Sequence, residues 1–321
     1  MANMKEVAKY AGVSVITVSR VINNPEIVKK ETREKVESVI EKLKYQGNQA
    51  ARALVSNKTR VIHVFIKQEI RMVDPFGMHF VAGISDALSE KYYSFLVRRD
   101  WDFPYKCDGI IAMGISKDEE PLIKEKFSVP TVLFGHSDLD IDSVDVDNFS
   151  GAYDMTKHLI ESGHKDIGII VINDINRRYV FDRLNGYKKA LTEHGIPVRS
   201  DLIKFGENNE QGGYYKAIEL LGESNVSAIC CTSDALALGA IRACRQFKKN
   251  VPHDVSVTGF DGLGYEMLTD PKITTVQQPV YEAGKELAEL LIEKIEKPET
   301  PMIQKMIKPQ ILFNNSVFMK E

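Results

Sequence analysis

Apolar residues near the start of the chain recur at helical spacing in three short segments. In the first segment they share one helical face: Met4, Val7, Ala8 and Ala11. Gly12 then supplies a left-handed turn, and Ser14 offers an N-cap oxygen to a second helix that begins at about Val15. On the second helix the inward apolar residues are Val18, Val21 and Ile22. On the third they are Val36, Val39, Ile40 and Leu43. Three such helices close a small core of about 45 residues.

The outward face of the second predicted helix is unusual for a solvated surface. Val15 and Ile16, two neighbouring aliphatic residues, are followed on that face by Ser19 and Arg20. In a DNA major groove, apolar groups touch thymine methyls and an arginine reaches guanine or phosphate. We therefore interpret the segment as a helix-turn-helix. The alternative, a helical bundle that caps a dimer, gives no role to the tight turn or to the outward arginine.

From about Val61 the pattern changes to short apolar runs that alternate with amphipathic helices. Six of these runs have the continuous apolar character of buried strands: VIHVFI, CDGIIAMG, VPTVLFG, DIGIIVI, VSAICCT and VSVTGFD. Continuous apolar strands separated by helices indicate parallel sheets covered on both faces. The body of the chain is therefore predicted to be a doubly wound α/β fold.

Charge is distributed unevenly along the 321 residues. Residues 1–60 hold twelve Lys and Arg against six Glu, a net charge of +6, which leaves −9 for the rest of the chain. A basic head on an acidic body is typical of a module that binds a polyanion. No apolar run approaches the roughly 18 residues of a membrane span, and no signal-peptide core precedes the head. We therefore expect a cytoplasmic, nucleoid-associated protein without membrane contact.

The sequence contains no pattern of catalytic or metal-binding residues. GxSxG, strand-linked GxGxxG and HExxH motifs are absent, and the seven histidines are scattered. The four cysteines show no CxxC pairing, so we expect reduced, buried thiols and neither a disulfide nor a zinc site. The chain is predicted not to be an enzyme and to carry no cofactor.

At its start the chain carries VAKYAGVSVITVSRVIN, TREKVESVIEKLKY, GNQAARALV and KTRVI. Further blocks follow in order: DVDNFSGAYD, SGHKDIGII, RLNGY, TSDALALGAIRA, PHDVSVTGFDG and ITTVQQP. This series closely resembles the LacI/GalR family of transcriptional regulators. The resemblance implies a small all-α helix-turn-helix headpiece and a two-lobed, periplasmic-binding-protein-like core.

The resemblance also implies how the chain divides. The helix-turn-helix domain takes residues 1–46, a hinge helix and linker take 47–59, and the effector-binding and dimerisation domain takes 60–321. Within the core we expect lobe 1 at about 61–150 plus 279–297 and lobe 2 at about 151–278 plus 298–321. A hinge segment of about nine residues is too short to be helical alone, so its folding is expected to accompany DNA binding.

The expected DNA contacts follow from this division. Val15, Ile16 and Arg20 are expected to read the major groove, and by resemblance Leu54 enters the minor groove at the operator centre. Gly47 replaces a proline that is usual in the family, which makes ordering of the hinge more costly. The remaining contacts are expected from Ser14, Thr17, Ser19, Asn23, Thr32, Asn48 and Ala51.

The effector contacts are expected where strands end, between the lobes. By resemblance Arg183 and Asp261 hold a sugar or purine effector, with Asp138 and Ser233 as secondary contacts. An arginine fork and a carboxylate suit the paired hydroxyls of a polyol. Two alternatives remain at this point: Asp138 lies in an acidic loop where it can simply face water, and Asp234 is expected to cap the helix that follows it.

Lobe 1 departs from the family between two predicted strands, YSFLVR and CDGIIAMG. Only RDWDFPYK joins them, whereas a parallel crossover usually contains a helix. The aromatic residues Trp101, Phe103 and Tyr105 in this connection either reshape a pocket or partner surface, or cover the bare side of the sheet. Lys67 is a second departure, since the family more often has a small polar residue there.

The function expected from these features is that of a ligand-controlled repressor of carbohydrate-related genes. It would bind double-stranded operator DNA as a homodimer and a sugar or sugar derivative between its lobes. A dimer is expected, and not a tail-linked tetramer, because no heptad tail follows NNSVFMKE. The alternatives are control by a partner protein and, from another class, a sugar receptor that does not bind DNA.

Overall fold

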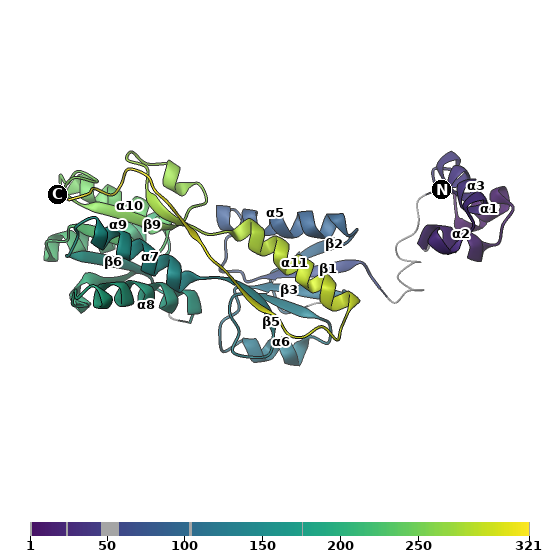
Figure 1. Ribbon diagram of the computed structural model, residues 1–321, viewed down its shortest axis with the longest axis horizontal. Coiled ribbons are helices and arrows are strands. Elements are labelled where there is room, and N and C mark those ends of the chain that lie inside the picture. The colour runs from purple at the N-terminus through teal and green to yellow at the C-terminus, as the bar shows by residue number, and fades with distance from the viewer. Residues whose placement is uncertain (1, 24, 46–57, 103–104, 175, 321) are drawn as a thin grey trace. The chain divides into compact units, whose positions relative to one another are not determined.

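The computed structural model describes residues 2–23, 25–45, 58–102, 105–174 and 176–320. Two compact units make up the chain, Met1–Arg60 and Val61–Glu321, and each is described by itself (Figure 1). Three expected DNA contacts, Asn48, Ala51 and Leu54, lie outside the described residues, as does Gly47.

The smaller unit is the predicted group of three helices. They are α1 (Met4–Ala11), α2 (Val15–Asn23) and α3 (Lys30–Lys42), with a 3-10 turn at Pro25–Ile27. Asn3 and Glu6 form a capping box at the start of α1, and Gly12 ends that helix with φ +63°. The turn places α2 across α1, so that Val7, Val18 and Val36 are fully buried together.

The larger unit contains two six-stranded sheets, which confirms the predicted doubly wound α/β fold. The first sheet has the order β11-β5-β4-β3-β1-β2, and every pairing in it is parallel. Its strands are β1 (Val61–Ile66), β2 (Ser94–Arg98), β3 (Gly109–Met113), β4 (Thr131–Phe134), β5 (Asp142–Val146) and β11 (Gln304–Ile307). Together with α5 (Pro75–Glu90), α6 (Glu120–Lys126) and α11 (Val280–Glu296), this sheet forms lobe 1.

The second sheet has the order β12-β10-β9-β8-β6-β7, and β12 runs antiparallel to β10. Its strands are β6 (Ile167–Ile172), β7 (Ile203–Gly206), β8 (Ala228–Cys231), β9 (Ser256–Asp261), β10 (Thr274–Gln277) and β12 (Gln310–Leu312). Lobe 2 adds α7 (Asn148–Glu161), α8 (Arg178–Glu193), α9 (Glu210–Glu223) and α10 (Asp234–Gln246), with 3-10 turns at Ser200–Leu202 and Tyr265–Met267. Cys230, Cys231 and Cys244 are buried in its core, as expected.

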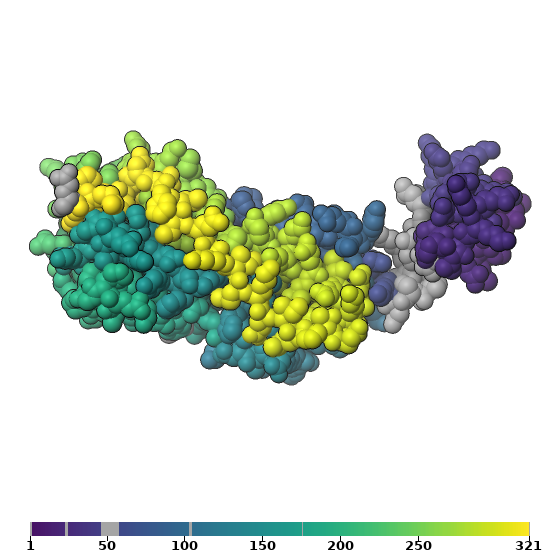
Figure 2. Space-filling model, in the orientation of Figure 1, coloured from purple at the N-terminus to yellow at the C-terminus, as the bar shows by residue number. Residues whose placement is uncertain are grey.

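The end of the chain differs from the expected division. We placed residues 298–321 wholly in lobe 2, but β11 pairs with β5 in lobe 1, and only β12 and the residues after it join lobe 2. In Figure 2 the last part of the chain crosses the surface of both lobes. The short strand β11 is largely exposed, so it lacks the apolar run by which a buried strand is recognised. The chain therefore passes between the lobes after β5, after β10 and after β11.

The shortened connection from β2 to β3 contains no helix among its described residues. Trp101 fills the space instead: its ring lies 4.6 Å from that of Phe65 and stacks on Phe127 at 5.9 Å. It belongs to the apolar cluster on the α6 side of the sheet, which includes Ile110 and Leu133. For Trp101 this supports the second interpretation, in which the aromatic residues cover the bare sheet, whereas Tyr105 is 67% exposed and lies outside this cluster. Phe103 lies outside the described residues.

Candidate functional site

The outward face of α2 is exposed as predicted. Val15 and Ile16 are 40% and 65% exposed, although both are aliphatic, while Val18 and Val21 on the opposite face are buried. Arg20 is exposed beside them. An apolar, basic surface on a short second helix suits insertion into a major groove.

The start of α2 is held by a local hydrogen-bond pair. The Ser14 hydroxyl accepts from the backbone N–H of Thr17 at 3.1 Å and lies 2.9 Å from the Thr17 hydroxyl. Ser14 therefore caps the helix, as predicted. Ser19 and Thr32 are half-buried. Asn23 ends α2, and its side chain lies outside what the structure describes.

In lobe 2, Arg183 is held by contacts with four residues. It projects from α8 and is 4% exposed. Its Nε donates to Asn148 Oδ1 at 2.8 Å, and its Nη1 donates to the carbonyl of Thr232 at 2.6 Å. The guanidinium carbon lies 3.7 Å from the ring centre of Phe260 and 5.0 Å from that of Tyr179. The arginine is thus fixed in one orientation at the carboxyl ends of the strands.

Asp261 ends β9 beside this arginine. Its Oδ1 lies 3.7 Å from Arg183 Nη1 and accepts from Gln278 Nε2 at 2.7 Å. Its φ of +126° lies in a region that favours glycine, so the surrounding contacts hold the residue in a strained backbone conformation. Burial raises the pKa of this carboxyl, and the charge of Arg183 opposes that rise. Strain and a shifted pKa coincide here with the residue that sequence reasoning selected.

The helix cap falls on Ser233 and not on its neighbour Asp234. Ser233 caps α10, because its hydroxyl accepts from the N–H of Leu236 at 3.3 Å, and it also donates to Asn208 Oδ1 at 2.7 Å. Asp234 is the first helical residue and not the cap, so that expectation is wrong. Its buried carboxylate accepts from Thr275 Oγ1 at 2.5 Å and from the N–H of Gly262 at 2.7 Å. Asp234 therefore braces the loop after Asp261.

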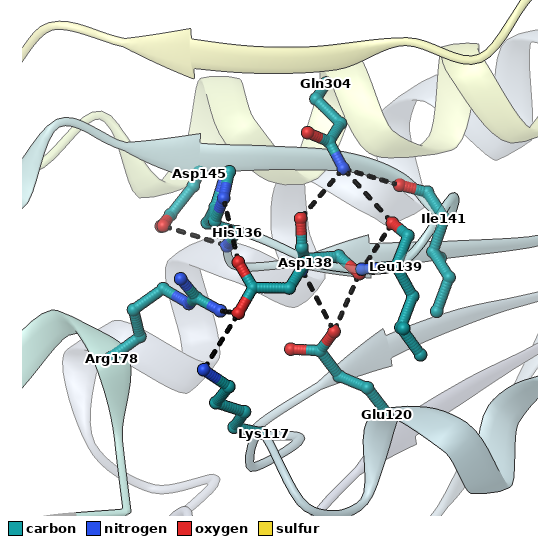
Figure 3. Close-up of polar contacts among 10 residues, drawn as sticks. Lys117, Glu120, His136, Asp138, Leu139, Ile141, Asp145, Arg178 and Gln304 are labelled. Atoms are coloured by element: carbon teal, nitrogen blue, oxygen red, sulfur yellow. Dashed lines mark hydrogen bonds and ion pairs between the residues drawn. The ribbon is translucent and has the colours of Figure 1, made fainter.

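Asp138, in the loop after β4, pairs with one cation of each lobe (Figure 3). Its Oδ2 lies 2.5 Å from Arg178 Nη2 of lobe 2 and 3.1 Å from Lys117 Nζ of lobe 1. Hydrogen bonds from these two cations lower the pKa of Asp138 to about 2. In this structure it bridges the lobes, a role that neither expectation for it included.

Lys67 is paired within lobe 1. Its Nζ lies 2.6 and 2.8 Å from the two carboxylate oxygens of Glu119, which also accepts from the N–H and hydroxyl of Ser116. The lysine that departs from the family is thus neutralised by a neighbouring acid.

Two cavities of about 300 Å³ each lie elsewhere: one is lined by residues that include Tyr187 and Arg199, the other by residues that include Asp142 and Lys294. Neither is lined by Arg183, Asp261, Asp138 or Ser233. Within the described part of the chain no group of acids, cysteines and histidines is arranged to hold a metal ion, and no helix is long and apolar enough to span a bilayer.

Comparison with known proteins places the chain in a family. Residues 3–48 match the bacterial regulatory proteins of the lacI family, and residues 156–317 match a periplasmic binding protein-like domain. The HTH-type transcriptional regulator YvdE of Bacillus subtilis strain 168 is 35% identical over 318 residues, which cover 98% of this chain and 99% of that protein. This chain belongs to the LacI family. It is a DNA-binding transcriptional regulator, as the sequence predicted, and its relatives are regulators and not enzymes.

Two solved structures resemble this LacI-family chain over nearly its whole length. The complex of the transcriptional regulator CelR with cellobiose is 28% identical, with a TM-score of 0.75, and the alignment covers 98% of this chain and 100% of that one. A Lac repressor dimer bound to operator and the anti-inducer ONPF is 23% identical, with a TM-score of 0.84 and 99% coverage of both chains. The second likeness shows that the fold is that of the Lac repressor.

In this LacI-family protein, sequence reasoning missed several residues of the site. Asn148 and Gln278 hold Arg183 and Asp261 respectively, and both stand in polar stretches that follow strands. Asp145 in β5 is 7% exposed and accepts from the N–H groups of His136 and Val146. Burial, with the nearby charge of Asp182, raises the pKa of Asp145 to about 6. An aspartate inside the buried strand DSVDV was the signal available for this residue.

Proposed function

We propose that this LacI-family protein is a repressor of carbohydrate-related genes that binds a pseudo-palindromic operator as a homodimer. A sugar or sugar derivative between the lobes controls its affinity for DNA. The observation that carries the proposal is the fixed group of Arg183, Asp261, Asn148 and Gln278 at the strand ends of lobe 2. A planar donor beside a carboxylate and two amides matches the alternating hydroxyls of a sugar.

The DNA half of the proposal rests on α2. Val15, Ile16 and Arg20 read base edges, while Ser14, Thr17, Ser19, Asn23 and Thr32 position the headpiece on phosphates. In the hinge, Asn48, Ala51 and Leu54 complete the contacts. The two similar structures support this class of function, because one is a regulator bound to cellobiose and the other is a repressor dimer on its operator.

Control by a partner protein was suggested by the shortened connection in lobe 1. Trp101 has a packing role there, since it contacts Phe65 and Phe127. The aromatic connection therefore no longer favours a partner protein over a sugar.

The test begins with selection of binding sites from genomic DNA by the purified full chain. We expect an inverted repeat whose affinity falls steeply between two salt concentrations. A panel of sugars and sugar phosphates is then screened for changes in melting temperature and in affinity for the recovered site. Recovery of DNA without a symmetric motif would overturn the operator assignment. A panel without any response by wild type, or an equal response by the Asp261→Asn variant, would overturn the effector assignment.

A further inference from the structure

The loop that carries Asp138 is held rigidly within lobe 1 (Figure 3). Glu120, which is 3% exposed, accepts from the Ser137 hydroxyl at 2.8 Å and from the N–H of Asp138 at 3.2 Å. From the other side, Gln304 Nε2 in β11 donates to the carbonyl of Ser137 at 3.0 Å and lies 3.4 Å from that of Leu139. A buried carboxylate and an amide thus fix the backbone on both flanks of Asp138, so its carboxylate is presented at a defined position.

Two adjacent arginines of lobe 2 reach this lobe. Arg178, the first residue of α8, lies 2.5 Å from Asp138 Oδ2. Arg177 donates through Nη1 to the carbonyl of Gly114, which follows β3, while its Nε lies 3.1 Å from Asp174 in its own lobe. The start of α8 therefore contacts the loops after two neighbouring strands of lobe 1.

The charges at this contact are complementary and partly shielded from water. The side chain of Arg178 is 30% exposed and that of Arg177 11% exposed. Lys117, at 74% exposed, adds a second cation to Asp138, and His136 Nε2 lies 3.8 Å from its other oxygen. One carboxylate thus pairs with a cation from each lobe. Separating the lobes would break the pair with Arg178 and leave the pair with Lys117 intact.

We propose that Asp138, Arg177, Arg178 and Lys117 form an interlobe clasp that holds the two lobes together before any effector binds. The inference rests on the proposed function only where it concerns effector affinity. Helix α8 carries both Arg178 and, about one and a half turns later, Arg183. Because a helix moves as a unit, opening the clasp moves Arg183 away from lobe 1. The clasp therefore sets the equilibrium between open and closed lobes on which an effector acts.

The test measures lobe separation without effector or DNA. Spin labels are placed at two exposed helical positions, one per lobe, by Glu125→Cys and Asn185→Cys in a Cys107→Ser background, and the distance distribution is recorded by pulsed electron resonance. Asp138→Asn is expected to raise the open fraction about two- to fivefold, the scale of a partly exposed ion pair. Asp140→Asn, which removes the same charge from an exposed position in the same loop, is the matched control and should leave the distribution unchanged.

A charge exchange separates pairing from a general loss of structure. Arg178→Asp alone should open the lobes, and Arg178→Asp combined with Asp138→Arg should return the distribution toward wild type. Equal distance distributions for wild type and Asp138→Asn would overturn the clasp. So would a distribution for the double variant that is no closer to wild type than that of Arg178→Asp alone. If no sugar of the panel binds, an increased open fraction in Asp138→Asn still supports the clasp. If Asp138→Asn leaves the distance distribution unchanged, the clasp is overturned but the proposed effector site is not.

Discussion

Replacing Arg183 by methionine removes the most highly connected side chain of the candidate effector site. The variant keeps an unbranched apolar stem over Phe260 but loses the donors to Asn148 and to the Thr232 carbonyl. Hydrogen bonds from a charged group contribute about 1.5–3 kcal/mol each, and breaking a buried pair costs about 3–5 kcal/mol. The variant no longer bears the free-energy cost of burying the Arg183 charge, which offsets part of this loss. We therefore expect a net decrease of about 2–4 kcal/mol in the free energy of unfolding at pH 7.

The loss in the Arg183→Met variant should depend on pH through Asp261. Burial raises the folded-state pKa of Asp261, and removing Arg183 raises it further because the opposing charge is gone. Between the unfolded and folded pKa values the native state binds more protons, so stability falls as the pH rises. We expect the loss to be smaller at pH 5 than at pH 7 by about 1 kcal/mol, since one pKa unit corresponds to 1.36 kcal/mol.

The assay is equilibrium unfolding in urea, followed by circular dichroism on the full chain at one protein concentration, at pH 5, 6 and 7. Arg199→Met is the matched control in lobe 2, because Arg199 is paired with Asp201 at 2.6 Å but lies at the surface. Its effect should be too small to measure. A deficit for Arg183→Met below 1 kcal/mol, or one that stays constant from pH 5 to pH 7, would refute this account of the site.

Three further predictions concern the headpiece and the packing of the lobes. Arg20→Ala should weaken specific operator binding by about 1–3 kcal/mol, and Ile16→Ala should relax preference at one base pair per half-site, whereas Ile27→Ala should change neither in a binding-site selection. Trp101→Ala should destabilise the chain by about 3–5 kcal/mol in urea unfolding without changing the response to a sugar that stabilises wild type. Gly186→Ala should lower the melting temperature by several degrees, because the new Cβ would collide with the backbone carbonyl of Phe149 on α7.

The fold was predictable because its signals are local. Continuous apolar runs such as Ile167–Ile172 stay buried on both faces, and Gly12 and Ser14 mark the turn between α1 and α2 within three residues. The strand β11 was assigned to the wrong lobe because its place depends on a distant partner, β5, and not on its own apolar content. Element type follows from nearby sequence, whereas lobe membership depends on contacts distant in sequence.

The position of the candidate site residues was predictable in part for the same reason. Asp261 was found because it directly follows an apolar strand, and Arg183 because its surroundings resemble the family. The cap was expected at Asp234 and lies at Ser233, because capping depends on where α10 begins, and a shift of one residue decides it. The clasp partner of Asp138 stands 40 residues away in the other lobe, so nothing near Asp138 in the sequence indicates it.

The position of α8 connects the proposed clasp with the proposed effector site. Gly186 lets α8 approach the backbone of α7 closely, and α7 begins at Asn148, directly after the first passage of the chain between the lobes. A ligand that engages Arg183 and Asn148 therefore acts on two helices that meet at this passage. The apparent affinity for an effector that binds only one arrangement of the lobes is proportional to the population of that arrangement, so Asp138→Asn must change effector affinity by the same factor by which it changes that population. Measuring Asp138→Asn in both assays compares those two factors, and a mismatch would show that effector binding and lobe closure are separate events.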